Sequence, residues 1–159
     1  MKEIQLTKGK IALVDDEDFD RINNYKWQSH LRFNYYYASR KSSRLLGKRK
    51  TIYMHREILN INDPNIHIDH ISHDGLNNQK SNLRICTSSQ NHANQKKHTN
   101  CSSIFKGVHW NTKKKRWISV LFMDRKVVHY KTFKCELLAG LSYDDAIKKH
   151  HGSFACTNF

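Results

Sequence analysis

An alternating run at residues 66–71 limits the fold of this chain more than any other feature. In the run Ile-His-Ile-Asp-His-Ile, apolar and polar residues alternate strictly, which is typical of a half-buried β-strand. A loop rich in Asp, Gly and Asn follows at residues 74–82, and a second strand is expected at residues 83–87. The serine pair at residues 88–89 can then cap a helix that runs to about Lys97. The pattern therefore predicts a compact β-β-α unit.

The segment before this unit is expected to be rich in β-structure. Residues 10–14 predict a strand, and residues 33–40 and 51–54 predict the two strands of a hairpin. The cationic segment at residues 41–50 joins the two strands of that hairpin. A short helix is expected at residues 55–60, before the Asp-Pro turn that ends it.

The C-terminal third of the chain predicts three strands and one helix. The strand-like runs are residues 107–110, 116–122 and 126–130, and the helix is expected at residues 136–150. Small and apolar residues recur every three or four positions along that helix, which favours close packing on a sheet. These residues are Ala139, Gly140, Tyr143, Ala146 and Ile147. The whole chain is therefore expected to have an α+β fold.

Positive charge is concentrated in the middle of the chain. The 159 residues carry a formal net charge of +14, but residues 31–134 alone hold 21 Lys or Arg against five acids, a net charge of +16. Lys and Arg release the counterions condensed on a nucleic acid, and aromatic rings between them can lie against sugars and bases. The charge distribution therefore favours a nucleic-acid partner, with a merely solvated basic surface as the alternative.

The N-terminus offers no signal for export. Residues 1–10 contain three lysines and no apolar core, so they are not expected to act as a signal peptide or a membrane anchor. We expect an intracellular, cytoplasmic protein.

Four polar residues in the β-β-α unit can support phosphodiester hydrolysis. Asp69 and His70 end the first strand, Asn82 lies in the loop, and Asn91 lies near the start of the helix. Hydrolysis needs an activated water and a cation at the leaving oxygen. A neutral imidazole can be the base, while a carboxylate and an amide oxygen can hold Mg²⁺. Because adjacent strand residues point to opposite sides, Asp69 and His70 suit in-line attack.

The spacing of these residues resembles the ββα-metal core of phage and group I intron HNH homing endonucleases. The segment at residues 53–56 resembles the one that precedes this core. The resemblance rests on His67-Ile68-Asp69-His70-Ile71, Asp74-Gly75, Asn78, Ser81-Asn82-Leu83-Arg84, Thr87, Gln90-Asn91 and Tyr53-Met54-His55-Arg56.

This resemblance implies a role for each residue of the set. Asp69 and Asn91 would be the metal ligands, His70 the general base, and Asn82 the residue that fixes the loop and orients His70. The third motif residue is Asn91 where many relatives carry His, and such variants resemble homing enzymes that bind a single cation. Because both donors are oxygens, Mg²⁺ or Mn²⁺ is favoured over Zn²⁺, with one ion per active site.

The C-terminal segment at residues 105–159 resembles an AP2/ERF-type DNA-binding domain. The matching positions are Lys106-Gly107-Val108-His109-Trp110, Lys115-Arg116-Trp117, Phe133, Ala139, Gly140, Tyr143, Asp144, Ala146, His151-Gly152-Ser153-Phe154 and Asn158-Phe159. The resemblance implies that the three-stranded sheet enters the major groove of double-stranded DNA.

The DNA-binding candidates that follow from both resemblances are mostly basic or aromatic. They are Lys106, His109, Trp110, Lys113, Lys114, Lys115, Arg116 and Trp117 in the C-terminal segment, and Arg84, Arg49 and Lys50 before it. The lysine run in the first turn is expected to contact phosphates without specificity. For Trp117, packing against the helix is the alternative.

Together these patterns predict four segments. A β-rich lead-in covers residues 1–49, an HNH nuclease core residues 50–99, a linker residues 100–104, and an AP2/ERF-like domain residues 105–159. The expected function is a sequence-directed DNA endonuclease of the homing type that nicks one strand or cuts both strands. The alternatives are a DNA-binding regulator that keeps the scaffold without cleavage, an RNA-binding protein, and a His-rich zinc cluster at residues 67–73.

Three leucines in the last helix, Leu137, Leu138 and Leu141, stand beside the small-residue face. Leu137 and Leu141 are four positions apart and are therefore neighbours on a helix surface. Two interpretations are open: the helix rotates so that one or two of the leucines join the core, or they form an exposed patch for self-association or interdomain docking.

Overall fold

The computed structural model of the chain describes residues 1–32, 34–43, 49–97, 99 and 101–159. These residues form two compact units, an N-terminal unit (Met1–Cys86) and a C-terminal unit (Thr87–Phe159). The expected α+β class is confirmed at the coarse level, because small antiparallel sheets occur with four α-helices in the described residues. Within that part of the chain, no helix is long and apolar enough to cross a membrane.

The division between the units lies earlier than the expected linker at residues 100–104. Helix α3 (Ser88–Asn94), expected to complete the nuclease core, packs instead within the C-terminal unit. Ala93 of this helix is 5% exposed and belongs to the apolar core of that unit, and its carbonyl accepts a hydrogen bond of 3.1 Å from the Cys156 amide. The predicted domain boundary is therefore displaced to the start of α3.

The N-terminal unit consists of three small sheets and two short helices. Its elements are β1 (Lys2–Gln5), β2 (Ile11–Val14), α1 (Asp16–Asn23), β3 (Gln28–Arg32), β4 (Tyr35–Lys41), β5 (Thr51–Tyr53), α2 (Met54–Ile58), β6 (His67–His70) and β7 (Leu83–Cys86). The sheets are β1-β2, β3-β4-β5 and β6-β7, all antiparallel. The predicted hairpin is thus confirmed as β4-β5, while Phe33 and residues 44–48 of its expected strand and loop lie outside the described residues.

One apolar core holds the N-terminal unit together. Buried side chains from β1, β2, α1, β4, α2 and β7 meet there: Ile4, Leu6, Ala12, Val14, Ile22, Trp27, Ala38, Met54, Ile58 and Leu83. Because Leu83 opens β7, this core also anchors the β6-β7 hairpin that carries Asp69 and His70.

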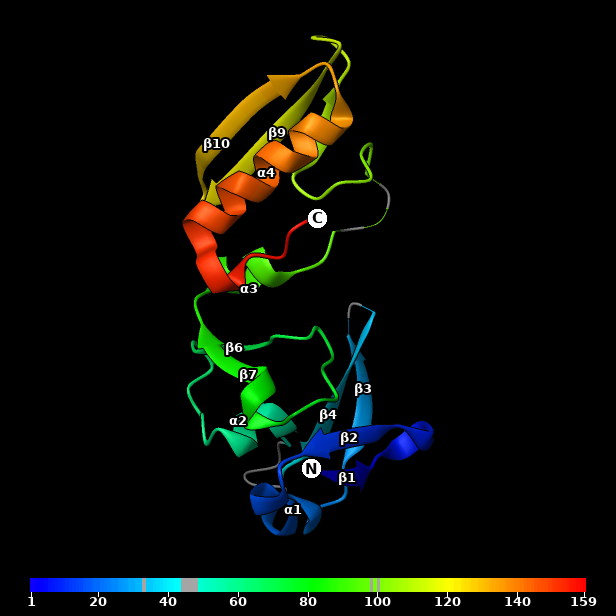
Figure 1. Cartoon of the computed structure of the whole chain (residues 1–159). Coiled ribbons are helices and arrows are strands. Elements are labelled where there is room, and N and C mark those ends of the chain that lie inside the picture. The colour runs from blue at the N-terminus through cyan, green and yellow to red at the C-terminus, as the bar shows by residue number, and fades with distance from the viewer. Residues whose placement is uncertain (33, 44–48, 98, 100) are drawn as a thin grey trace. The chain divides into compact units, whose positions relative to one another are not determined.

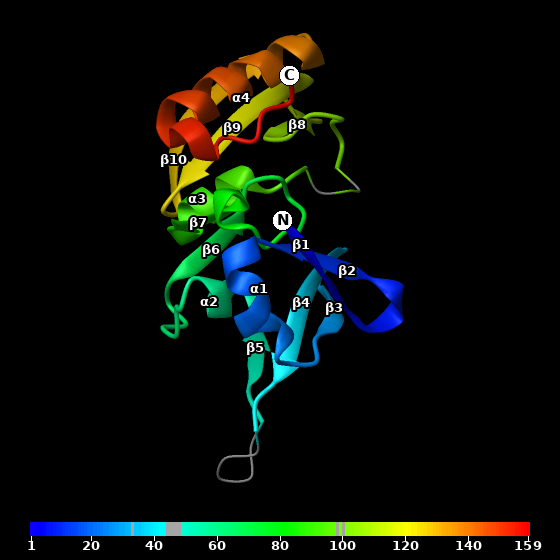
Figure 2. The ribbon, with the colours of Figure 1, turned by 60° about the horizontal axis from the view of Figure 1, so that its bottom comes forward.

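The C-terminal unit is a three-stranded sheet with a long helix along it. Strands β8 (Val108–Asn111), β9 (Arg116–Met123) and β10 (Lys126–Phe133) form an antiparallel sheet in the order β10-β9-β8. Helix α4 (Glu136–His151) lies along one face of this sheet, as both Figure 1 and Figure 2 show. The predicted three strands and helix are confirmed to within three residues at each end.

Small residues allow α4 to approach its neighbours closely. Ala139, Gly140, Tyr143, Ala146 and Ile147 are all buried, which confirms the expected packing face. A Cβ atom at Gly140 would stand 2.9 Å from the Phe105 ring, and at Gly107 it would collide with the Tyr143 ring. Gly107 also has a φ of +72°, a conformation that residues with a side chain rarely adopt.

The three leucines beside that face are all exposed. Leu137, Leu138 and Leu141 are 47%, 53% and 43% exposed. The interpretation in which they join the core is therefore wrong. The three leucines are exposed on the surface of the C-terminal unit.

Candidate active site and nucleic-acid interface

The β6-β7 hairpin places Asp69 and His70 next to each other at its end. Asp69 lies opposite Arg84 and His70 lies opposite Leu83 in the strand register. Both side chains are buried, with Asp69 6% and His70 7% exposed. Because side chains alternate along a strand, the carboxylate and the imidazole face different surroundings.

His70 is held among aromatic rings and a buried amide. Its Nε2 lies 3.5 Å from Oδ1 of Asn78, and its ring centroid is 5.8 Å from that of Tyr37 and 5.1 Å from that of His55. Burial lowers the pKa of His70, partly opposed by the Asn78 contact and the nearby carboxylates. His70 is therefore neutral at pH 7, the form that a general base requires.

The amide of Asn78 is a hydrogen-bond partner that bears on the tautomer of His70. Asn78 is 1% exposed, and its Nδ2 donates to the Leu76 carbonyl at 2.9 Å, so its Oδ1 faces the imidazole. An acceptor at this place favours the tautomer with a proton on Nε2 and the lone pair on Nδ1. Asn78 is among the residues that carry the resemblance to HNH enzymes, but the resemblance implies no role for it.

Asn82 closes the loop between the two strands. Its Oδ1 accepts from the Ser72 amide at 2.9 Å, and its Nδ2 donates to the Asn77 carbonyl at 2.8 Å. Its own carbonyl accepts from the Ile71 amide at 2.9 Å. The geometry agrees with the expected loop-fixing role, because these bonds determine the path of the chain directly after His70.

Asp69 is engaged by Arg84. Its Oδ2 lies 2.8 Å from Nε and 2.7 Å from Nη2 of the guanidinium. Arg84, expected as a DNA contact, is instead only 16% exposed at its side chain and neutralises the buried carboxylate. A cation at Asp69 would have to share this carboxylate with Arg84.

Asn91, the second expected metal ligand, lies in α3 of the C-terminal unit. One carboxylate and one amide are oxygen donors of the kind that Mg²⁺ and Mn²⁺ accept, so the donor types fit the expected ion. Across the described ranges, no cluster of three or more His, Cys, Asp and Glu side chains is placed to hold a metal. The alternative of a His-rich zinc cluster at residues 67–73 therefore has no support.

A second imidazole, which was not among the predicted site residues, stands beside His70. The ring of His55 stacks on that of Tyr53 at 5.5 Å, and its buried Nδ1 has no hydrogen-bond partner among the residues that the structure describes. Burial, with smaller contributions from His70 and Arg56, lowers the pKa of His55 to about 3. In the sequence, His55 belongs to the 53–56 segment that resembles the lead-in to the HNH core, and this resemblance implies no role for His55 itself.

Gly75 allows Tyr37 to reach this cluster. A Cβ atom at Gly75 would collide with the Tyr36 carbonyl and would stand 2.8 Å from the Tyr37 ring. Glycine at this position therefore lets β4 and the 71–82 loop approach closely enough for Tyr37 to contact both His55 and His70.

The C-terminal sheet has two faces that differ in composition. The strand register places His109, Asn111, Arg116, Ile118 and Val120 on the face away from α4. The same face carries three exposed apolar or aromatic side chains, with Phe122 59%, Val127 54% and Tyr130 48% exposed. Ile118 in the middle of this face is buried, at 2% exposure. Basic and aromatic groups together around it, on the face that α4 does not cover, suit contact with a nucleic acid.

Some of the expected DNA-binding residues lie on this sheet face, and others lie in the β8–β9 turn or in the N-terminal unit. His109 and Arg116 lie on the sheet face, and Lys113, Lys114 and Lys115 are exposed in the β8–β9 turn. Nζ of Lys114 lies 3.2 Å from the hydroxyl of Tyr130, which sequence reasoning did not single out. The remaining candidates in the N-terminal unit, Arg49 and Lys50, are both exposed.

Trp110 and Trp117 lie on the α4 side of the sheet. They form an opposite pair across β8 and β9, with ring centroids 5.1 Å apart. Trp117 is partly buried and packs against the apolar core, as the packing alternative predicts. Trp110 is 37% exposed at the end of this face.

Lys106 is also turned inward. Its Nζ donates to the Ala93 carbonyl at 2.6 Å and lies 3.5 Å from the Cys156 carbonyl. Burial lowers the pKa of Lys106. In this structure the Lys106 amine therefore joins α3 to the C-terminal tail.

Comparisons of the chain with protein-family models, with curated proteins and with solved structures find no match. Evidence on function therefore comes from the motif and from the geometry of the two units.

Proposed function

We propose that this protein is a metal-dependent DNA endonuclease of the HNH homing type whose C-terminal unit is an AP2/ERF-like DNA-binding domain. The observation that carries the proposal is the environment of His70. It is a buried, neutral imidazole at the end of a β-hairpin, and the loop behind it is closed by Asn82. The motif spacing from Asp69 to Asn91 also supports the proposal, because it resembles the order of the catalytic and metal-binding residues in HNH enzymes.

His70 acts as the general base in the proposed reaction. With Nε2–H directed at Asn78, Nδ1 accepts the proton of the attacking water. Asn82 and Asn78 are positioning residues, since they hold the loop and the ring rather than the substrate. The rings of Tyr37 and His55 limit the access of bulk water to the imidazole.

A Mg²⁺ or Mn²⁺ ion held by Asp69 and Asn91 would stabilise the charge that develops on the leaving oxygen. Arg84 balances the Asp69 carboxylate within the hairpin. Arg84 thereby holds the carboxylate in one orientation, and a fixed carboxylate is what precise placement around a phosphorus atom requires.

The C-terminal unit binds duplex DNA in this proposal. The sheet face away from α4 presents His109 and Arg116 beside the exposed ring of Tyr130, and the lysines at residues 113–115 extend from its turn. Phosphate contacts from these lysines position the unit, and groups on the sheet face read the base edges.

A second candidate is a DNA-binding regulator that does not cleave. The observation in its favour is the Asp69–Arg84 ion pair, because a buried guanidinium already occupies the carboxylate expected to hold the metal. Cleavage of DNA decides between the two functions.

The test is incubation of the full chain with genomic DNA of its host and Mg²⁺, followed by mapping of the ends. The wild-type protein and His67→Ala are expected to give the same defined ends, since His67 is exposed on the same strand. His70→Ala is expected to slow cleavage by about 10²- to 10⁴-fold with little loss of DNA affinity. An active His70→Ala protein would contradict the assignment, and defined binding without cleavage by the wild type would favour the regulator.

A further inference from the structure

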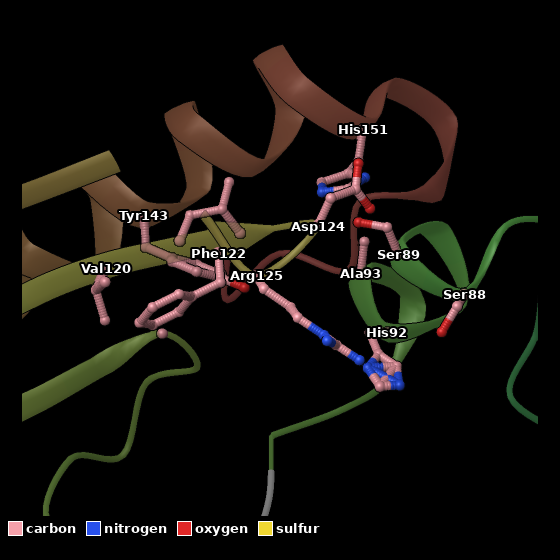
Figure 3. Close-up of a pocket in the computed structure, with 12 residues that line it drawn as sticks. Ser88, Ser89, His92, Ala93, Val120, Phe122, Asp124, Arg125, Tyr143 and His151 are labelled. Atoms are coloured by element: carbon pink, nitrogen blue, oxygen red, sulfur yellow. The ribbon is translucent and has the colours of Figure 1, made fainter. Parts of the chain in front are cut away.

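A cavity in the C-terminal unit is not used by the proposed cleavage. Its volume is about 860 Å³, and residues of α3, β9, the β9–β10 turn and α4 line it (Figure 3). This volume is in the range of pockets that bind small organic ligands.

The cavity lining combines buried apolar residues with polar residues, most of which are exposed. Ala93, Leu121 and Tyr143 are buried, while Phe122 is 59% exposed at one side. The polar lining consists of Ser88, Ser89, His92, Asp124, Arg125 and His151. An apolar lining with a few convergent polar groups is typical of a site for an organic molecule that carries a charged end.

Arg125 and His92 supply the basic side of the cavity. Figure 3 shows the Arg125 guanidinium extending toward the His92 imidazole, whereas Asp124 lies beside His151. Among the residues that the structure describes, neither the Arg125 nor the His92 side chain has a hydrogen bond or an ion pair. Two basic groups that converge without an acid between them favour an anion, and a guanidinium suits the oxygens of a phosphate.

The backbone of the β9–β10 turn is strained at the residue that supplies this guanidinium. Asp124 and Arg125 form the two-residue turn between Met123 and Lys126, with φ values of +49° and +64°. This turn type usually takes Asn-Gly, because residues with longer side chains avoid positive φ. Arg125 thus occupies a position that glycine would fill with less strain, and its side chain is directed into the cavity.

The exposed ring of Phe122 supplies a flat apolar surface on the other side. Aromatic side chains bind nucleobases by stacking, and every base offers a π-face to them. We propose that the cavity binds a nucleoside monophosphate group, with the phosphate on Arg125 and His92 and the base against Phe122. The group can belong to a free nucleotide or to a nucleotide of DNA.

The first experiment is calorimetric titration of the full chain with deoxyadenosine 5′-monophosphate, with deoxyadenosine, and with inorganic phosphate. The monophosphate is expected to bind more tightly than either part alone. Arg125→Ala is expected to weaken its binding by about tenfold or more, as the loss of a charge-assisted hydrogen bond predicts. His92→Ala and Phe122→Ala are expected to weaken it by smaller factors.

Arg116→Ala is the matched control, because Arg116 lies on the sheet face and is absent from the cavity lining. It is expected to leave monophosphate binding unchanged and to weaken duplex binding. Urea unfolding first checks that each variant has the same midpoint urea concentration as the wild type. Equal affinity of wild type and Arg125→Ala for the monophosphate, or no saturable binding at millimolar concentrations, would overturn the proposal.

Competition identifies the source of the nucleotide. If duplex DNA displaces the monophosphate and Arg125→Ala weakens both, the cavity takes a nucleotide of DNA. If the duplex and the monophosphate bind together, the ligand is a free nucleotide. Neither result depends on cleavage, so the cavity proposal and the proposed nuclease function fail or succeed separately.

Discussion

Arg84 and Asp69 face each other across the β6-β7 hairpin, with Nη2 of the guanidinium 2.7 Å from Oδ2 of the carboxylate. Both side chains are largely removed from water, at 16% and 6% exposure. A buried carboxylate without a partner is strongly unfavourable, so this pair supports the strand that carries His70.

Arg84→Met is therefore expected to destabilise the protein by about 3–5 kcal/mol, because it removes the guanidinium that pairs with the buried Asp69 carboxylate. The double variant Asp69→Asn with Arg84→Met removes both charges and is expected to recover most of the loss. Urea unfolding measures both changes. A single variant as stable as the wild type would show that Asp69 finds another partner.

His55 is expected to make the stability of the N-terminal unit depend on pH. Its pKa is about 3 in the folded protein and about 6.5 in the unfolded chain, so below pH 6.5 the unfolded chain binds the extra proton. The stabilisation is complete above pH 6.5 and is lost as pH falls, by about 2 kcal/mol at pH 5.

His55→Phe removes this titration and keeps a ring in the cluster. Its free energy of unfolding is expected to fall less than that of the wild type between pH 7 and pH 5, as urea titrations at each pH would show. His70, His129 and His151, whose pKa values burial also lowers, contribute to the residual dependence. Identical pH profiles for wild type and variant would mean that His55 is protonated equally in both states.

Substitutions at Lys106 and Lys113 are expected to have different effects: the first on stability and the second on DNA binding. Lys106→Met removes the hydrogen bonds to the Ala93 and Cys156 carbonyls and is expected to destabilise the C-terminal unit by about 1–3 kcal/mol. Lys113→Ala, at an exposed turn position, is expected to leave stability unchanged and to weaken duplex binding. Thermal unfolding and fluorescence anisotropy measure the two effects. If the Lys106→Met protein is as stable as the wild type but binds duplex DNA more weakly, Lys106 contacts DNA.

The leucine patch on α4 is expected to tolerate charge. Leu137→Glu with Leu141→Lys changes two exposed side chains, so the free energy of unfolding should shift by less than about 0.5 kcal/mol. Ile147→Ala on the same helix, at a fully buried position, is the control and should cost about 2–5 kcal/mol. If the patch serves self-association, sedimentation will show a smaller particle mass for the charged variant than for the wild type. If the charged variant is unfolded, the leucines support the core.

Local patterns in the sequence determined most of the secondary structure. The alternation at residues 66–71 predicted β6, and the period of small residues at 139–147 predicted the packed face of α4, because strand and helix periodicities are properties of neighbouring residues. The helix expected after residue 87 is α3, but its cap is Thr87 in a capping box with Gln90, and the expected cap at Ser88 or Ser89 is wrong.

Tertiary packing decided what sequence spacing could not. Lys106, Arg84 and Trp117 looked like surface contacts, yet each is held by a partner distant along the chain: a carbonyl of α3, a carboxylate across a hairpin, and the apolar core. The same holds for His55, which meets His70 only because α2 and β6 come together in the fold. Burial and partners of this kind depend on long-range contacts, and a pattern of neighbouring residues carries no information about them.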